Sequence, residues 1–186
     1  MLAVVALVGL TACTPNKEDK PPVPKATVDV KAGAATEPAA LGTLPKIAAA
    51  PKWSLKDVDG KTVTSDDLKG KVVVVDFWAT WCPPCRMEIP GYVELQKKYG
   101  KDGFVIVGAS MDEGGPEAVK SFATSKGINY MMVMADEAVV AAFGGIEGLP
   151  TTFLIDRNGQ IRDRKIGFED HETYEKKVEA VLGEKA

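Results

Sequence analysis

The chain has 186 residues, which predicts about one domain on the usual prior of ~150 residues each. With 45% hydrophobic and 26% charged residues it is neither collagen-like, wholly disordered nor a multi-span membrane protein. The net charge of −3, without a long basic block, argues against a nucleic-acid partner. Three cysteines are too few for a disulfide-stapled scaffold, and their number is odd.

The N-terminal segment is typical of an export signal. Residues 2–10 form an unbroken apolar run, too short to span a membrane but long enough for a signal-peptide core, although no lysine or arginine precedes it. The run ends in Leu10-Thr11-Ala12-Cys13, which resembles a bacterial lipobox. We expect residues 1–12 to be a lipoprotein signal peptide and Cys13 to carry a lipid that anchors the chain to a membrane without a spanning helix. The alternative is an ordinary secretion signal with an incidental cysteine.

Residues 13–50 are expected to be a lipidated cysteine followed by a flexible tether. Seven of the twelve prolines lie between Pro15 and Pro51, and no apolar periodicity interrupts this Pro/Ala-rich stretch. Such a segment buries too little apolar surface to offset the entropy of ordering it. The globular domain is therefore expected at residues 51–186.

The domain begins with a predicted hairpin around Asp59-Gly60, a dipeptide that favours tight turns. Residues 71–78, KVVVVDFW, form a continuous β-branched and aromatic run that predicts a central strand buried on both faces. Further strands are predicted at residues 104–109, 130–134, 151–155 and 160–166.

Helical spacing of apolar residues separates these strands. The groups are Ile89, Tyr92 and Val93; Val119, Phe122 and Ala123; and Tyr174, Val178, Val181 and Leu182. Asp136 is expected to cap a short helix that ends at Gly144. The alternation predicts an α/β fold with a central mixed β-sheet flanked by helices.

The motif Cys82-Pro83-Pro84-Cys85 follows the central strand directly. At the start of a helix, free N–H groups and the helix dipole stabilise a thiolate on the first cysteine, and the second lies within one turn. This placement favours a reversible disulfide. A purely structural disulfide would close too small a loop to stabilise much. A zinc site is disfavoured because only Cys13 and the single histidine, His171, remain to complete four ligands.

At these residues the sequence resembles the thioredoxin superfamily. Residues 75–85, VDFWATWCPPC, are similar to its active-site segment, Pro90 falls where that family kinks its first long helix, and residues 148–156, GLPTTFLID, are similar to its cis-proline loop and following strand. The predicted N-terminal hairpin, the exported anchor and a strand–helix insertion between Phe104 and Phe143 resemble the TlpA/ResA branch of membrane-anchored thiol:disulfide oxidoreductases. The resemblance covers residues 51–186 and implies a thioredoxin-like fold.

The resemblance implies a role for each site residue. Cys82 would be the exposed attacking thiolate and Cys85 the buried resolving thiol. Pro150 would be cis, and the backbone of Leu149 would bind an extended substrate segment. Trp81 would shield the thiolate and contact partners. No cofactor beyond the cysteine pair is implied.

Asp76 is the most informative single residue because it lies inside an apolar strand. We expect burial to raise its pKa, so that it exchanges the proton of Cys85. The alternative is a side chain that reaches solvent at the strand end. Some ResA-like members carry a neutral amide at this position, and thioredoxin has Gly-Pro rather than Pro-Pro between its cysteines. Both departures bear on the redox potential.

The function implied is reduction of disulfides in exported proteins on the extracytoplasmic side of the cell envelope, with apocytochrome c as a candidate client and a membrane thiol-electron transporter as electron donor. Two alternatives remain. A peroxiredoxin-like peroxidase requires a threonine three residues before its reactive cysteine, where this chain has Ala79. A non-catalytic binding module with a thioredoxin fold is the other, since fold alone does not define function.

Overall fold

The computed structural model describes residues 43–184. The predicted signal peptide, Cys13 and most of the predicted tether lie outside the described residues. Within residues 43–184, no helix is long and apolar enough to cross a membrane.

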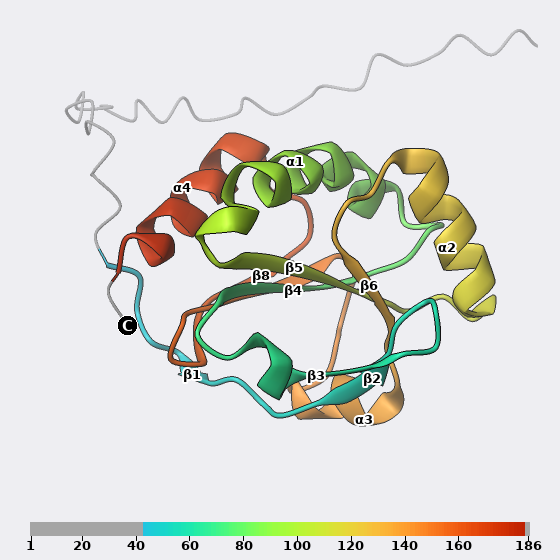
Figure 1. The fold of residues 1–186 in the computed structure, drawn as a ribbon, viewed down its shortest axis with the longest axis horizontal. Coiled ribbons are helices and arrows are strands. Elements are labelled where there is room, and N and C mark those ends of the chain that lie inside the picture. Colours follow the sequence, from blue (N-terminus) through green and yellow to red (C-terminus); the bar gives the residue numbers. More distant parts are fainter. Residues whose placement is uncertain (1–42, 185–186) are drawn as a thin grey trace, which may run out of the picture. The chain divides into compact units, whose positions relative to one another are not determined.

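A six-stranded mixed sheet forms the centre of the domain, in the order β1-β8-β7-β4-β5-β6 (Figure 1). The strands are β1 (Ala48–Ala49), β4 (Val72–Trp78), β5 (Phe104–Ser110), β6 (Met131–Met134), β7 (Thr151–Ile155) and β8 (Gln160–Ile166). β4 pairs in parallel with β5 and antiparallel with β7. All seven residues of β4 are buried, which confirms the predicted central strand.

Helices and a small hairpin cover the two faces of the sheet. In Figure 1, α1 (Pro83–Tyr99) and α4 (His171–Leu182) lie above it, whereas α3 (Glu137–Ala142), β2 (Ser54–Lys56) and β3 (Thr62–Thr64) lie below. α2 (Gly115–Lys126) packs near β6. The 3-10 helices η1 (Ser65–Leu68) and η2 (Gly100–Asp102) precede β4 and β5. This arrangement confirms the predicted thioredoxin-like α/β fold.

Side-chain alternation along β4 divides the core in two. Val72 and Val74 pack against α1 and α4, while Val73, Val75 and Phe77 pack against the hairpin and α3. Because successive strand residues point to opposite faces, Asp76 points to the same face as Val74, beneath α1.

The predicted hairpin forms, but its turn is longer than expected. β2 and β3 pair as a separate two-stranded sheet, and residues 57–61 connect them. The side chain of Asp57 accepts hydrogen bonds from the backbone N–H groups of Asp59 and Lys61 at 2.9 and 2.8 Å. Gly60 has a φ of +80°, which glycine adopts without strain.

The start of the folded region is a correction to the predicted boundary at residue 51. Residues 48–49, assigned to the tether, form β1 and pair antiparallel with Gln160 and Ile161 of β8. The side chain of Arg162 also donates to the carbonyl oxygens of Leu44 and Pro45. Backbone pairing and a buried arginine therefore hold residues 44–49 on the sheet, although their sequence lacks strand periodicity.

Helix α3 begins as the sequence predicts. Asp136 is its N-cap, and its carboxylate accepts from the N–H of Val139 at 2.8 Å. Gly144 follows the C-cap residue Phe143 with a φ of +84°. A short polar side chain and a glycine thus set both ends of this helix.

Candidate active site

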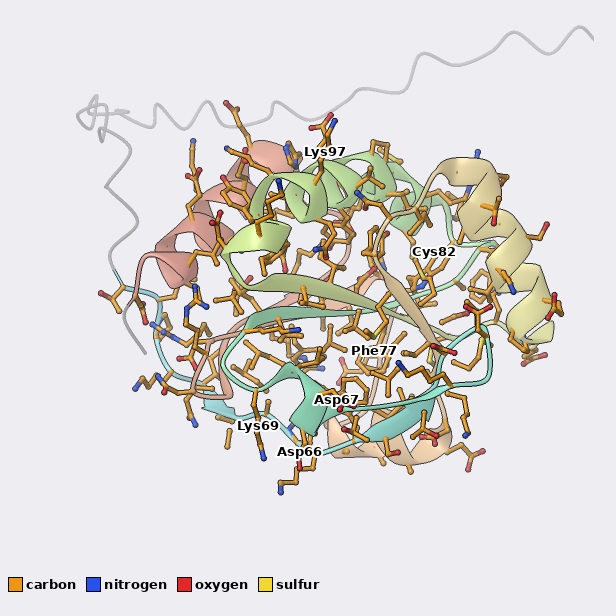
Figure 2. All side chains as sticks on the ribbon, in the orientation of Figure 1. Asp66, Asp67, Lys69, Phe77, Cys82 and Lys97 are labelled. Carbon is orange, nitrogen blue, oxygen red and sulfur yellow. A yellow bond between two sulfur atoms is a disulfide. The ribbon has the colours of Figure 1, made fainter. Side chains whose placement is uncertain are left out.

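The two cysteines lie where β4 gives way to α1, beyond the carboxyl end of the strand; Cys82 is labelled in Figure 2. Cys82 is the N-cap of α1, and Cys85 is in its first turn. A disulfide joins them, with the Cα atoms 5.4 Å apart. The N–H of Cys85 donates to Sγ of Cys82 at 3.3 Å. The motif therefore forms the disulfide that its spacing predicted.

The helix start favours a thiolate on Cys82 once the disulfide is reduced. No acidic residue occupies the first turn of α1, and Arg86 lies just beyond Cys85. Pro83 and Pro84 fill helix positions whose N–H groups would have no partner within the helix. The N–H of Cys85 and the positive end of the helix dipole therefore act on the Cys82 sulfur without a competing carboxylate in that turn.

Cys82 is not exposed in this oxidised form, contrary to the expectation from the sequence. Both cysteines are only 3% exposed and pack with Trp78, Ile89 and other apolar side chains. Trp81 instead is 66% exposed and presents an aromatic surface beside the disulfide.

The loop before the cysteines is held by an aspartate that the sequence analysis did not identify. The carboxylate of Asp112 accepts from the backbone N–H of Thr80 at 2.9 Å and from its hydroxyl at 2.5 Å. It also accepts from the hydroxyl of Ser110 at 2.8 Å. Two of these hydrogen bonds therefore fix Thr80, just before Trp81 and Cys82, and the third holds the Asp112 carboxylate to β5. Asp112 lies just after β5, and only the pairing of β4 with β5 brings it here.

The peptide bond between Leu149 and Pro150 is cis, as the resemblance implied. The carbonyl oxygen of Pro150 accepts from the N–H of Gly167 at 2.8 Å, and the hydroxyl of Thr151 donates to the carbonyl oxygen of Gly148 at 2.6 Å. Leu149 packs against the apolar cluster that contains both cysteines. The structure thus brings the cis-proline loop to the disulfide.

Asp76 lies in a polar row that crosses three neighbouring strands. The register pairs Asp76 of β4 with Thr152 of β7, and Thr152 with Lys165 of β8. The hydroxyl of Thr152 donates to Oδ1 of Asp76 at 2.9 Å. Glu88, on α1, forms a buried ion pair with Lys165. The carboxylate, hydroxyl and ammonium groups therefore share the sheet face beneath α1.

Burial raises the pKa of Asp76 to about 7, with a further contribution from the charge of Glu88; Lys165 and the Thr152 hydrogen bond act in the opposite direction. Two carboxylates here share one lysine, and Glu88 contacts it directly. Asp76 therefore still holds a proton near neutral pH. Only 4% of Asp76 is exposed, which rules out the alternative of a solvated side chain at the strand end.

The predicted site residues thus fall into two groups. Cys82, Cys85 and Leu149 belong to one apolar cluster, with Trp81 and Pro150 next to them in the chain, whereas Asp76 lies on the face beneath α1. Cys13 lies outside the described residues. Within residues 43–184, no three histidine, cysteine, aspartate or glutamate side chains gather as a metal site would require.

Sequence reasoning missed the partners of Asp76. Glu88 precedes Tyr92 by four residues, so helical spacing is a signal that could have placed it on the buried face of α1. No comparable signal marked Thr152 or Lys165, because their position depends on the register between strands distant in sequence.

Comparison with known proteins agrees with this geometry. The family model described as Redoxin matches residues 45–182, and the chain belongs to this family. A solved structure of a thioredoxin-family thiol:disulfide interchange protein from Chlorobium tepidum TLS superposes with a TM-score of 0.69 at 39% identity, covering 75% of this chain and 99% of that one.

Curated relatives support the same class. The chain is 36% identical over 126 residues to the thiol-disulfide oxidoreductase ResA of Bacillus thuringiensis strain Al Hakam, covering 68% of this chain and 72% of that protein. It is 34% identical over 131 residues to the thioredoxin-like protein YneN of Bacillus subtilis strain 168, covering 70% and 76%. Together with the Cys82–Cys85 disulfide, these relatives identify a thiol:disulfide oxidoreductase of the TlpA/ResA-like group.

Proposed function

We propose that this oxidoreductase donates electrons to disulfides of exported proteins on the extracytoplasmic side of the cell envelope. The observation that carries the proposal is a disulfide at a helix N-terminus, on the sheet face that also holds a buried carboxylate with a pKa of about 7. The relatives named thiol-disulfide oxidoreductase ResA support the exchange chemistry by their similarity. The signal-like residues 1–12 and the lipobox-like Cys13 support the location.

The exchange proceeds in two steps. The Cys82 thiolate attacks one sulfur of the client disulfide, the client S–S bond breaks, and the other client sulfur leaves as a thiolate. Cys85 then gives its proton to Asp76, attacks Sγ of Cys82 and releases the second client sulfur. Two electrons pass to the client, and the protein is left with the Cys82–Cys85 disulfide seen here.

Substrate capture is assigned to the surface around the disulfide. The indole of Trp81 would contact the client, and the backbone of Leu149 before cis-Pro150 would pair with an extended client segment. Because an extended segment offers backbone groups whatever its sequence, this mode suits an unfolded client whose cysteines are still accessible. An apocytochrome c before haem attachment has this character.

An electron supply is part of the same proposal. Compartments outside the cytoplasm are oxidising, so the protein needs a donor that carries reducing equivalents across the membrane. We assign this role to a membrane thiol-electron transporter. A lipid on Cys13 would hold the domain near that donor.

The proposal is tested with a peptide that carries the two cysteines of a haem-attachment motif, joined as a disulfide. We expect the reduced protein to reduce this peptide in a stoichiometric reaction, followed by alkylation and mass shift. Cys13→Ser serves as the background, so that only Cys82 and Cys85 exchange. If the oxidised protein instead converts the dithiol peptide to its disulfide, the proposed direction is wrong.

A further inference from the structure

A chain of polar side chains leads from Asp76 to Glu88, which lies about one helical turn after Cys85 on α1. The hydroxyl of Thr152 lies 2.9 Å from Oδ1 of Asp76 and 3.3 Å from the hydroxyl of Tyr92. The Tyr92 hydroxyl in turn lies 3.5 Å from Oε2 of Glu88. Every member is buried, and each hydroxyl both donates and accepts. The exchange of thiols and disulfides accounts for Asp76 but leaves Thr152, Tyr92 and Glu88 without a role.

Tyr92 is the residue of this chain with the most polar neighbours. Its hydroxyl has three polar neighbours, Thr152, Glu88 and Lys165, at 3.3, 3.5 and 3.4 Å. These distances exceed the roughly 2.7–2.8 Å of a well-formed O–H···O bond, so no single partner holds the hydroxyl tightly. Burial raises the pKa of Tyr92 well above its usual value, which keeps its proton in place at neutral pH. The hydroxyl is thus free to reorient between Thr152 and Glu88.

Glu88 ends the chain at a pocket between α1 and the start of α4. The pocket has a volume of about 110 Å³, room for several water molecules. Its polar walls include Glu88, Glu169 and His171, and neither cysteine lines it. The side chain of His171 is 37% exposed. The pocket therefore gives Glu88 a contact with water that is separate from the surface around Trp81.

We propose that Thr152, Tyr92 and Glu88 form a proton route that connects Asp76 with the pocket beside His171. The route rests on the proposed role of Asp76 as the proton acceptor of Cys85. Its use follows from the client complex: a client bound over Trp81 and Leu149 covers the surface nearest the disulfide. A proton taken from Cys85 then leaves through this pocket, whose lining includes neither Trp81 nor Leu149.

Protons and charges balance along the route. Protonated Asp76 donates to Thr152, Thr152 donates its own proton to Tyr92, and Tyr92 donates its proton to Glu88. Asp76 becomes a carboxylate, Glu88 becomes a carboxylic acid, and both hydroxyls keep one proton. Glu88 then releases a proton to water in the pocket. After the transfer Thr152 donates to Asp76, as it does in the structure, and rotation of the two hydroxyls turns them back toward Tyr92 and Glu88.

The charges around the route favour such a transfer. Lys165 of β8 contacts Glu88 and lies beside Thr152 in register. Its positive charge is therefore near the negative charge whether that charge is on Glu88 or on Asp76. The other titratable groups that face Asp76 are Tyr130, before β6, and Tyr174, on α4; burial raises the pKa of both phenols, which stay neutral. On the β5 side the register partner of Asp76 is Gly108, which brings no charge.

The test follows the proton of Asp76 in the oxidised full-length protein, without client or turnover. The pH is jumped from about 6 to about 8, either side of the Asp76 pKa, and time-resolved infrared spectroscopy records the loss of the protonated carboxyl band. Asp76→Asn assigns that band. We expect Tyr92→Phe to slow the loss at least about tenfold, because the phenyl ring cannot pass a proton from Thr152 to Glu88; tenfold corresponds to about 1.36 kcal/mol of activation free energy.

Three further variants separate the route from general effects on packing. Tyr174→Phe removes a buried hydroxyl that has no hydrogen-bond partner within residues 43–184, and it is expected to relax at the wild-type rate. Thr152→Val removes the first link and is expected to relax slowly, whereas Thr152→Ser keeps the hydroxyl and is expected to restore the rate. The Asp76 pKa of each variant is titrated first, because the Thr152 hydrogen bond lowers that pKa.

Equal relaxation of Tyr92→Phe and the wild type would overturn the route, and so would equal slowing by Tyr92→Phe and Tyr174→Phe. Because these measurements need no exchange of disulfides, the outcome is independent of the client. A protein that reduces clients but relaxes identically in all variants would keep its proposed function and lose this route.

Discussion

Replacing Cys82 with serine is expected to abolish thiol–disulfide exchange, with a fall in rate of at least about a thousandfold, because a serine hydroxyl does not ionise near neutral pH and does not form a disulfide. The helix N-terminus that stabilises the Cys82 thiolate gives serine no comparable reactivity. The measurement is the rate of client-peptide reduction by the pre-reduced variant, with its fold checked by circular dichroism.

The matched control is Cys85→Ser. This variant keeps the attacking thiolate and loses the thiol that resolves the mixed disulfide, so it should accumulate a Cys82–client adduct visible as a mass increase. Full activity of Cys82→Ser in a native-client assay would contradict a redox role and favour a thioredoxin-fold binding module.

Replacing Asp76 with asparagine is expected to stabilise the oxidised protein at pH 8 by about 2–4 kcal/mol, because ionising a carboxylate in this buried site costs free energy that asparagine does not incur. The pKa of Asp76 is raised from 3.8 to about 7 by burial first and by Glu88 second. Asparagine has nearly the same shape and still accepts the hydrogen bond from Thr152. Denaturant unfolding of both proteins across the pH range measures the difference.

The free energy of unfolding of the wild type is expected to fall as pH rises, relative to that of Asp76→Asn. Between about pH 4 and pH 7, the folded wild type holds a proton on Asp76 that the unfolded chain has lost, so its free energy of unfolding falls as pH rises. Above about pH 7 both states are ionised at Asp76, and the gap to Asp76→Asn stays constant. Near pH 4 the two proteins should be equally stable.

Asp67 offers a control of opposite sign. Its carboxylate accepts from the backbone N–H and hydroxyl of Thr64, and these hydrogen bonds lower its pKa. It is labelled in Figure 2, in η1 before the start of β4. Asp67→Asn should therefore lose stability at pH 8. An Asp76→Asn variant that is less stable than the wild type at pH 8 would contradict the account of the buried carboxylate.

Local patterns in the sequence were enough to predict the fold and the cysteine site. Three features are each contained in a short stretch of consecutive residues: the apolar run of β4, the Cys-Pro-Pro-Cys motif after it and the loop before Pro150. They can therefore be recognised without knowledge of the fold. The raised pKa of Asp76 followed from the same run, because a strand without polar alternation offers no solvated face.

Features that depend on contacts between distant segments were not predicted. β1 is two alanines whose pairing with β8 joins residues more than a hundred positions apart, and no periodicity marks it. Lys165 looks like a surface lysine in the sequence, yet the register of β7 and β8 places it beside Thr152 beneath α1. A shift of the register by one residue would turn the side chain of Lys165 to the other face of the sheet.

The central claim is that Cys82 and Cys85 form a reversible, reducing couple. A redox titration against defined thiol buffers tests it most directly, with Cys13→Ser as background and alkylation mass shift as readout. The account predicts a two-electron midpoint near or below about −250 mV, close to the thioredoxin value of about −270 mV. A midpoint near about −120 mV, typical of the strong oxidant DsbA, or the lack of any reversible couple, would contradict it.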